Sequence, residues 1–232
     1  MSDARYAIYF MPEPDTALAR FGAAAIGYDA WSGARVPFPD LALYAGTDLP
    51  AWTKDPARYG FHATLKAPFH LREGASEAEL HALVADFAKR RAAVSLGDLD
   101  VVALSRFLAL CPRTPSKALI ALAADCVTYF DGFRAPTTEA DRARRLASPL
   151  SERQIAYLDA WGYPYVLDEF RFHMTLAGPL DEATKAILKE ALAGLWQPIS
   201  APVTLDAIAI ACQPRRDGPF VVQARYPLAG EA

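Results

Sequence analysis

The chain has 232 residues, of which 53% are hydrophobic and 22% charged, a globular balance with enough apolar material for one large domain. Its net charge of −3 at pH 7 gives no bulk reason to expect a nucleic-acid partner. The three cysteines form no CxxC pair and no run of about 18 uncharged apolar residues occurs, so a disulfide framework, a zinc site and a membrane span are not expected. The first ten residues do not resemble a signal peptide, which favours a cytoplasmic protein.

The first quarter of the chain predicts one strand and one helix before a long loop. Residues 5–10 are rich in β-forming side chains and predict a strand. An Ala-rich stretch over residues 15–26 predicts a helix with Asp15 as its N-cap. Many Gly and Pro residues between positions 28 and 56 indicate a loop, and residues 59–69 predict the next strand.

The middle of the chain alternates helices and strands. Ser76, with Glu79 three residues later, forms a capping-box pattern and predicts a helix to about residue 92. Two strands, over residues 94–96 and 99–110, follow as a hairpin. Residues 116–130 predict another helix.

The last part of the chain begins with an unusual segment. Residues 136–168 predict two short helices followed by a stretch rich in Tyr and Pro. Its Arg142, Arg144 and Arg145 could help hold a second phosphate, although a charged helix face is more often simply solvated. A helix over residues 181–195 and strands over 203–211 and 220–226 complete the chain.

Two nearly identical pentapeptides indicate an internal duplication. FHATL occupies residues 61–65 and FHMTL residues 172–176, and each is followed by a proline, a helix and a pair of strands. We therefore expect a single bilobal domain over residues 1–232. Its halves would lie roughly at 58–135 and 169–228, with residues 136–168 as an inserted helical segment.

Strand alternation gives each pentapeptide two different faces. In the first copy Arg58, His62, Thr64 and Lys66 share one face, and in the second copy Arg171, His173 and Thr175 do so. The Phe and Leu side chains point the other way, toward a core. A lone His–Thr pair on a strand is usually structural, but two such pairs with basic neighbours in duplicated halves favour one active site.

Two imidazoles fit the cleavage of a phosphodiester. One neutral ring can take a proton from the attacking oxygen, and one protonated ring can deliver a proton to the leaving oxygen. Thr hydroxyls can donate hydrogen bonds to the phosphoryl oxygens, and Lys or Arg can offset their charge. Two histidines with threonines and basic neighbours are a poor metal shell, so no metal and no cofactor are expected.

The paired motifs HATL and HMTL resemble those of the 2H phosphoesterase superfamily, which includes bacterial and eukaryotic cyclic phosphodiesterases. The longer stretches RYGFHATLKAPF and DEFRFHMTL resemble its DUF1045 branch, which is associated with phosphonate-utilisation operons. The resemblance implies an α+β fold with two antiparallel sheets around a central cleft and helices outside. It also implies a metal-independent hydrolase, a cyclic phosphodiesterase that acts on a small sugar or nucleotide cyclic phosphate and has a place in phosphonate metabolism.

The resemblance makes His62 and His173 the catalytic pair, with Thr64 and Thr175 as phosphate ligands. From the residues themselves, Arg58, Lys66 and Arg171 are candidate charge partners for the phosphate, and Tyr9 and Tyr165 candidate stacking groups for a base or sugar. The remaining histidines, His70 and His81, are expected to be structural or exposed. The near symmetry of the halves does not say which histidine is the base.

Two other functions stay open at this stage. The groove could act on a 2′,3′-cyclic RNA end, although the acidic balance of the chain argues mildly against an RNA partner. It could also bind a phosphorylated ligand or an RNA end without turning it over. The presence of two titrating groups favours catalysis over binding alone.

Overall fold

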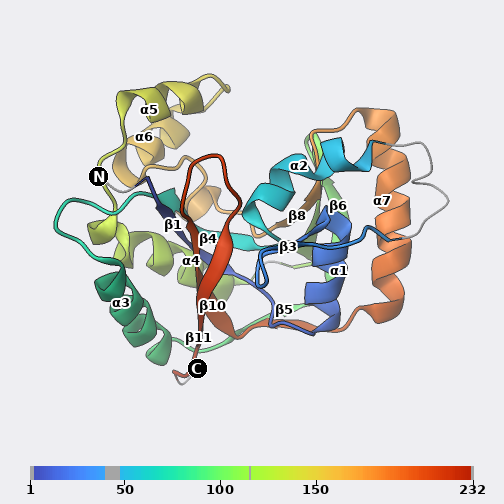
Figure 1. Cartoon of the computed structure of the whole chain (residues 1–232), viewed down its shortest axis with the longest axis horizontal. Helices are drawn as coiled ribbons and strands as arrows, with labels where there is room; N and C mark the ends of the chain where they lie inside the picture. The colour runs from blue at the N-terminus through green and yellow to red at the C-terminus, as the bar shows by residue number, and fades with distance from the viewer. Residues whose placement is uncertain (1–2, 40–47, 115, 231–232) are drawn as a thin grey trace.

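Two antiparallel sheets form the framework of the chain in the computed structural model, which describes residues 3–39, 48–114 and 116–230 (Figure 1). The first sheet has the order β11–β10–β1–β4, and its strands are β1 Arg5–Phe10, β4 Ala63–Phe69, β10 Ala207–Gln213 and β11 Val221–Pro227. The second has the order β6–β7–β8, with β6 Leu99–Leu104, β7 Phe107–Pro112 and β8 Met174–Ala177. Two smaller pairs join β5 Val94–Gly97 to β9 Val203–Leu205 and β2 Tyr28–Asp29 to β3 Ala34–Arg35.

Helices cover the outer faces of the two sheets (Figure 1). The first sheet is packed by α3 Glu77–Lys89 and α4 Lys117–Tyr129, and the second by α1 Ala17–Ile26 and α7 Glu182–Trp196. Helix α2, Leu49–Tyr59, contacts β8, while α5 Glu139–Leu146 and α6 Glu152–Trp161 pack against each other. Short 3₁₀ turns occupy Asp131–Phe133, Leu167–Glu169 and Gln197–Ile199. The predicted α+β class with antiparallel sheets and outer helices is confirmed.

The two sheets draw strands from both parts of the sequence. The order β1–α1–β4–α3–β5–β6 is followed by the matching order β7–α4–β8–α7–β9–β10. The first motif strand, β4, pairs with β1, the first strand of its repeat, and β1 pairs with β10, the last strand of the other repeat. In the same way the second motif strand, β8, pairs with β7, and β7 pairs with β6. The equivalent strands β5 and β9 pair with each other, as a two-fold relation requires. The repeat therefore begins again at β7, so the sheets do not divide along the expected halves 58–135 and 169–228.

Local capping signals place most helices where the sequence predicts them. Ser76 and Glu79 form the capping box of α3, and Ser116 and Asp181 cap α4 and α7. The N-cap of α1 is Thr16, whose hydroxyl accepts from the Ala19 amide, so the prediction of Asp15 was wrong. No helix among residues 3–39, 48–114 and 116–230 is long and apolar enough to cross a bilayer.

Helix α2 corrects the expected loop over residues 28–56 and the expected strand start at residue 59. Asp48 caps its first turn, Pro50 stands where a helix tolerates proline, and Gly60 ends it with a φ of 76°. These are helix boundary signals hidden in a Pro-rich stretch. Residues 40–47 of that expected loop lie outside the described part of the chain. Because α2 runs to Tyr59, Arg58 lies on a helix and not on the motif strand.

Candidate active site

Both pentapeptides present two faces, as alternation predicts. In the first copy Phe61, Ala63 and Leu65 are buried while His62 and Thr64 are half-buried. In the second copy Phe172, Met174 and Leu176 are buried, with His173 and Thr175 half-buried. The apolar positions thus anchor each strand in the core and leave a His and a Thr on the face with open space.

His62 is held by the backbone and by two neighbouring side chains. Its Nδ1–H donates to the Gly60 carbonyl at 2.8 Å, which leaves Nε2 as the basic nitrogen. The Thr64 hydroxyl lies 3.1 Å from that Nε2 and donates to it. The Tyr9 ring stacks on the imidazole with centroids 3.9 Å apart. The basic nitrogen of His62 therefore points toward the Thr64 hydroxyl.

His173 repeats this backbone contact. Its Nδ1–H donates to the Arg171 carbonyl at 2.8 Å, again the carbonyl two residues earlier. Its ring lies 5.5 Å from the Phe107 ring. Both histidines therefore expose the same nitrogen, Nε2, because the same local backbone turn fixes both tautomers.

Side chains of both motifs line one cavity of about 520 Å³ between the repeats, the motif cavity. Its wall includes Thr64, Phe107, Tyr163, Tyr165, Arg171 and His173. The two motifs are also joined beneath it. Phe10 pairs with Ala63 across the first sheet, and its ring lies 6.0 Å from the ring of Phe172. The two pentapeptides are thus brought into a single site.

Burial controls the protonation of both imidazoles. Burial lowers the pKa of His62 to about 4, the Gly60 carbonyl opposes this effect, and the charge of His173 lowers it further. The last effect indicates that the two imidazoles lie within electrostatic range of each other. Burial also lowers the pKa of His173, again against its backbone hydrogen bond. At pH 7 both rings of the free protein are therefore neutral bases.

The structure does not bring Lys66 to the histidines. Its ammonium group is buried, donates to the Val127 carbonyl at 2.8 Å and pairs with Asp131 at 3.0 Å. A β-bulge at Leu65 is the cause. Thr64 pairs with Tyr9 and Lys66 with Ile8, two adjacent residues of β1 that face opposite ways, so Lys66 turns toward α4. The prediction that Lys66 binds substrate does not fit this placement.

The second motif has the same bulge. Thr175 pairs with Ala109 and Ala177 with Leu108, so Leu176 is the extra residue. Thr175 stays on the His173 side of its strand, whereas Ala177 turns away in the same manner as Lys66. The bulge is thus part of the duplicated motif and ends its polar face directly after the threonine.

The other predicted site residues take varied positions. Arg171 is exposed and lines the motif cavity, as does Tyr165, which is 42% exposed. Arg58 lies in the last turn of α2 and donates to the Arg216 carbonyl. Tyr9 is fully buried against His62 and is therefore a support for the imidazole.

His70 and His81 stand apart from the motif cavity. The ring of His70 lies 3.0 Å from the Ala4 carbonyl, and that of His81 contacts Tyr226 and Gln223. Both rings are held by polar partners, which fits the structural role expected for them.

Several residues at the site were not among the predicted ones. The Tyr59 ring lies 6.1 Å from the His62 ring, centroid to centroid. Arg5 lies four residues before Tyr9 on β1 and shares a sheet face with it. Glu169 and Gln154 line the motif cavity and hydrogen-bond to each other at 3.0 Å. Strand parity in β1 could have indicated Arg5, but no sequence pattern indicated Tyr59, because it was expected to begin a strand and instead ends α2.

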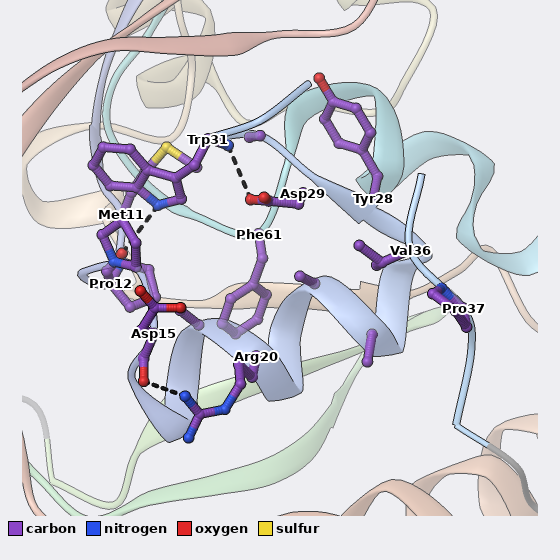
Figure 2. A pocket seen from close by; sticks show the side chains of 15 residues that line it. Met11, Pro12, Asp15, Arg20, Tyr28, Asp29, Trp31, Val36, Pro37 and Phe61 are labelled. Atoms are coloured by element: carbon purple, nitrogen blue, oxygen red, sulfur yellow. Dashed lines mark hydrogen bonds between the residues drawn. The ribbon is translucent and has the colours of Figure 1, made fainter. Parts of the chain in front are cut away.

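A second cavity, of about 480 Å³, lies behind the first motif (Figure 2). Figure 2 shows Phe61 between helix α1 and the side chains of Met11 and Trp31. Phe61 is the packing residue next to His62, and a Cβ at Gly22 of α1 would lie only 1.9 Å from its ring. This cavity therefore contacts the motif from its apolar side and contains neither histidine.

A protein-family model described as "Protein of unknown function (DUF1045)" matches residues 64–221, well over half of the chain. The chain belongs to the DUF1045 family. The match includes Thr64 of the first motif and the whole of the second motif, and it covers all of the second repeat and the later part of the first.

Two curated relatives carry the name "Ribose 1,5-bisphosphate phosphokinase PhnN". The one from Janthinobacterium sp. (strain Marseille) is 38% identical over 98% of this chain, and the one from Laribacter hongkongensis (strain HLHK9) is 35% identical over 93%. The matched region is 51% and 50% of those proteins, so the chain spans about half the length of the relatives that it matches.

Three solved structures are similar over nearly their whole length, each at 16% identity. They are E. coli LigT complexed with 3′-AMP (97% of both chains, TM-score 0.45), TT0787 of Thermus thermophilus (98% and 100%, TM-score 0.43) and a protein named only as a phosphoesterase (98% of both, TM-score 0.42).

Proposed function

We propose that the chain is a phosphoesterase that hydrolyses a cyclic phosphodiester by two-histidine acid–base catalysis. The observation that carries this proposal is the motif cavity, where Thr64 of one repeat and His173 of the other line the same space. Two imidazoles, each with its Nδ1 bound to a backbone carbonyl, offer two Nε2 atoms for proton transfer. A binding module would not need two such groups.

His62 is the general base in this proposal and His173 the general acid. His62 has the pKa lowered to about 4, so it is neutral at working pH and can take a proton from water. His173 lines the motif cavity, and the negative charge of a phosphate bound there would favour its protonated form. Water oxygen bonds to phosphorus, the ring P–O bond breaks, and His173 protonates the leaving oxygen.

The threonines and the cationic side chains stabilise the phosphate in this scheme. The Thr64 hydroxyl, 3.1 Å from His62, can turn to donate to a phosphoryl oxygen, with Thr175 in the equivalent place. Arg171 supplies positive charge at the cavity wall. These donors perform the charge stabilisation, and the proposed reaction requires no metal ion.

The substrate is a cyclic phosphate of a small sugar, with a ribose ring favoured by the relatives. Opening a ribose 1,2-cyclic phosphate at oxygen 2 leaves the phosphate on oxygen 1. Position 1 is also phosphorylated in the reactant for which the relatives are named, ribose 1,5-bisphosphate. A place in phosphonate breakdown is part of this proposal and rests on the family resemblance.

The test is a screen of the purified protein against nucleoside 2′,3′-cyclic, ribose 1,2-cyclic and linear phosphodiesters. Phosphorus NMR identifies the ring bond that breaks. His62→Ala and His173→Ala should each lower the rate by roughly 10²–10⁴-fold, the usual worth of one such group. Ligand binding without product after long incubation would support a binding module, and full activity of both variants would refute the mechanism.

A further inference from the structure

A short turn before the second motif carries a carboxylate that the proposed mechanism does not use. Glu169 is the last residue of the 3₁₀ turn Leu167–Glu169 and stands four residues before His173 in the chain. Glu169 and Gln154 of α6 line the motif cavity together with His173. The wall of the cavity therefore holds a carboxylate and an amide besides the groups proposed to act on the phosphate.

Three side chains of α6 hold the Leu167–Glu169 turn in place. Arg153 forms an ion pair with Asp168, and the Tyr157 hydroxyl donates to the same carboxylate. Gln154 Nε2 donates to Glu169 Oε2 at 3.0 Å. Helix α6 thus fixes both carboxylates of the turn, with Asp168 exposed and Glu169 at the motif cavity.

The backbone of this turn is strained at its first residue. Leu167 has a φ of 55°, in the left-handed region that side chains such as leucine seldom adopt. Conformations of this kind persist where the surrounding contacts fix them, and they concentrate at active sites and ligand-binding segments. Leu167 itself lines the motif cavity, so the strained residue lies where a substrate would contact the protein.

The Glu169 carboxylate has an oxygen available for a ligand. Over residues 3–39, 48–114 and 116–230 its Oε1 has no hydrogen-bond partner and the carboxylate forms no ion pair, since the neighbouring Arg153 pairs with Asp168. The lowered pKa of His173 follows from burial and from the Arg171 carbonyl, without a contribution from Glu169. Because a carboxylate repels phosphate, its partner must be a donor on an uncharged part of the substrate.

Aromatic rings complete the wall around this carboxylate. Tyr163 and Tyr165 both line the motif cavity and meet edge to face, with ring centroids 5.6 Å apart. Phe107 and Phe170 line the same cavity. A sugar presents hydroxyl donors at its rim and C–H groups on its faces, so a carboxylate and an amide among aromatic rings suit a sugar ring.

We propose that Glu169, positioned by Gln154, accepts a hydrogen bond from a free hydroxyl of the substrate's sugar and so determines specificity for hydroxylated sugars. This inference rests on the proposed function, because it places the cyclic phosphate at His62 and His173 and the sugar against the Leu167–Glu169 turn. Glu169 takes no part in proton transfer. The inserted segment thereby contributes to the choice of substrate through α6.

The kinetic test compares ribose 1,2-cyclic phosphate with its 3-deoxy and 5-deoxy forms, each of which lacks one free hydroxyl. In the wild type one of these changes should lower kcat/KM by roughly 10–100-fold, the usual effect of a hydrogen bond to a charged group. Glu169→Ala should lose this preference, and Glu169→Gln, which keeps an acceptor oxygen, should retain part of it. The matched control is Glu190→Ala, an exposed carboxylate on α7. Equal kcat/KM for all three sugars in the wild type overturns the proposal.

A further variant separates recognition of the sugar from support of the turn. Asp168→Asn weakens the contacts of the turn with Arg153 and Tyr157 but leaves Glu169 in the motif cavity, so it should keep the preference of the wild type. Equal loss of the preference in Asp168→Asn and Glu169→Ala would show that Glu169 only supports the turn, and would overturn the proposal. Thermal unfolding of each variant checks its fold; if Glu169→Ala does not fold, the reduced preference of Glu169→Gln carries the test.

A binding measurement distinguishes failure of this inference from failure of the proposed function. If no cyclic phosphate is hydrolysed, the proposed function fails, but in calorimetry the wild type should still bind ribose 1,2-cyclic phosphate more tightly than one of its deoxy forms. Glu169→Ala should bind that pair of compounds equally. Equal binding of all three compounds by the wild type overturns the role of Glu169, whether or not hydrolysis occurs.

Discussion

Replacing His62 by Gln should remove a pH-dependent part of the free energy of unfolding. Burial lowers the pKa of His62 from 6.5 to about 4. Between these values the unfolded chain binds a proton that the folded chain does not, so the free energy of unfolding falls as the pH falls. The full difference corresponds to about 3 kcal/mol, and at pH 5 the contribution is about 2 kcal/mol below that at pH 7.

Urea unfolding followed by circular dichroism at pH 7 and pH 5 measures this effect. The wild type should lose about 2 kcal/mol more than His62→Gln between the two pH values. Lost stacking on Tyr9 destabilises the variant equally at both pH values and cancels in the comparison. Equal losses in the two proteins would show that His62 titrates near its ordinary pKa, and the electrostatic description of the site would be wrong.

Three further predictions concern the reaction, the bulge and the packing behind the motif. Because burial lowers the pKa of both imidazoles, a plot of kcat/KM against pH should be bell-shaped, with its acid limb near pH 4 and its maximum below pH 6.5. A maximum above pH 8 would contradict this prediction. Lys66→Met should destabilise the chain by about 2 kcal/mol in urea unfolding, because it removes the buried donor to the Val127 carbonyl and Asp131. The same change should leave kcat/KM nearly unchanged, and a large loss of kcat/KM would show that Lys66 takes part in the site. Gly22→Ala should lower the free energy of unfolding by about 1–3 kcal/mol, because its Cβ would overlap the Phe61 ring. Gly194→Ala in α7 has open space around it and should be neutral or stabilise the chain by up to about 1 kcal/mol. Equal effects of the two changes would contradict the packing argument.

The sequence predicted the elements that local signals determine. Capping residues such as Ser76 and Asp181 located helices, and strand alternation predicted correctly that His62 and Thr64 share a face. The duplication was visible because the two pentapeptides kept both their core-facing and their polar residues. These features depend on neighbours in sequence, which is why they can be read without a structure.

Other features depend on partners far away in the chain. The bulge at Leu65 exists because β4 pairs with β1, and alternation alone therefore placed Lys66 on the wrong face. The start of the repeat at β7 became visible only through the exchange of strands between sheets. The Arg5 side chain donates to the Gln213 side chain, which lies 208 positions later in the chain, and no local pattern connects the two.

The exchange of strands also has a consequence for the origin of the site. The first repeat alone holds the motif strand β4 and its neighbour β1, but the second edge of β1 pairs with β10, the last strand of the second repeat. Two identical copies of a single repeat could complete each other in the same manner, with β5 and β9 as equivalent strands meeting at the axis. Such a symmetric dimer would have two equal histidines facing one another. Joining the copies in one chain allows the halves to diverge, so that Lys66 and Ala177, or the surroundings of His62 and His173, need no longer be alike.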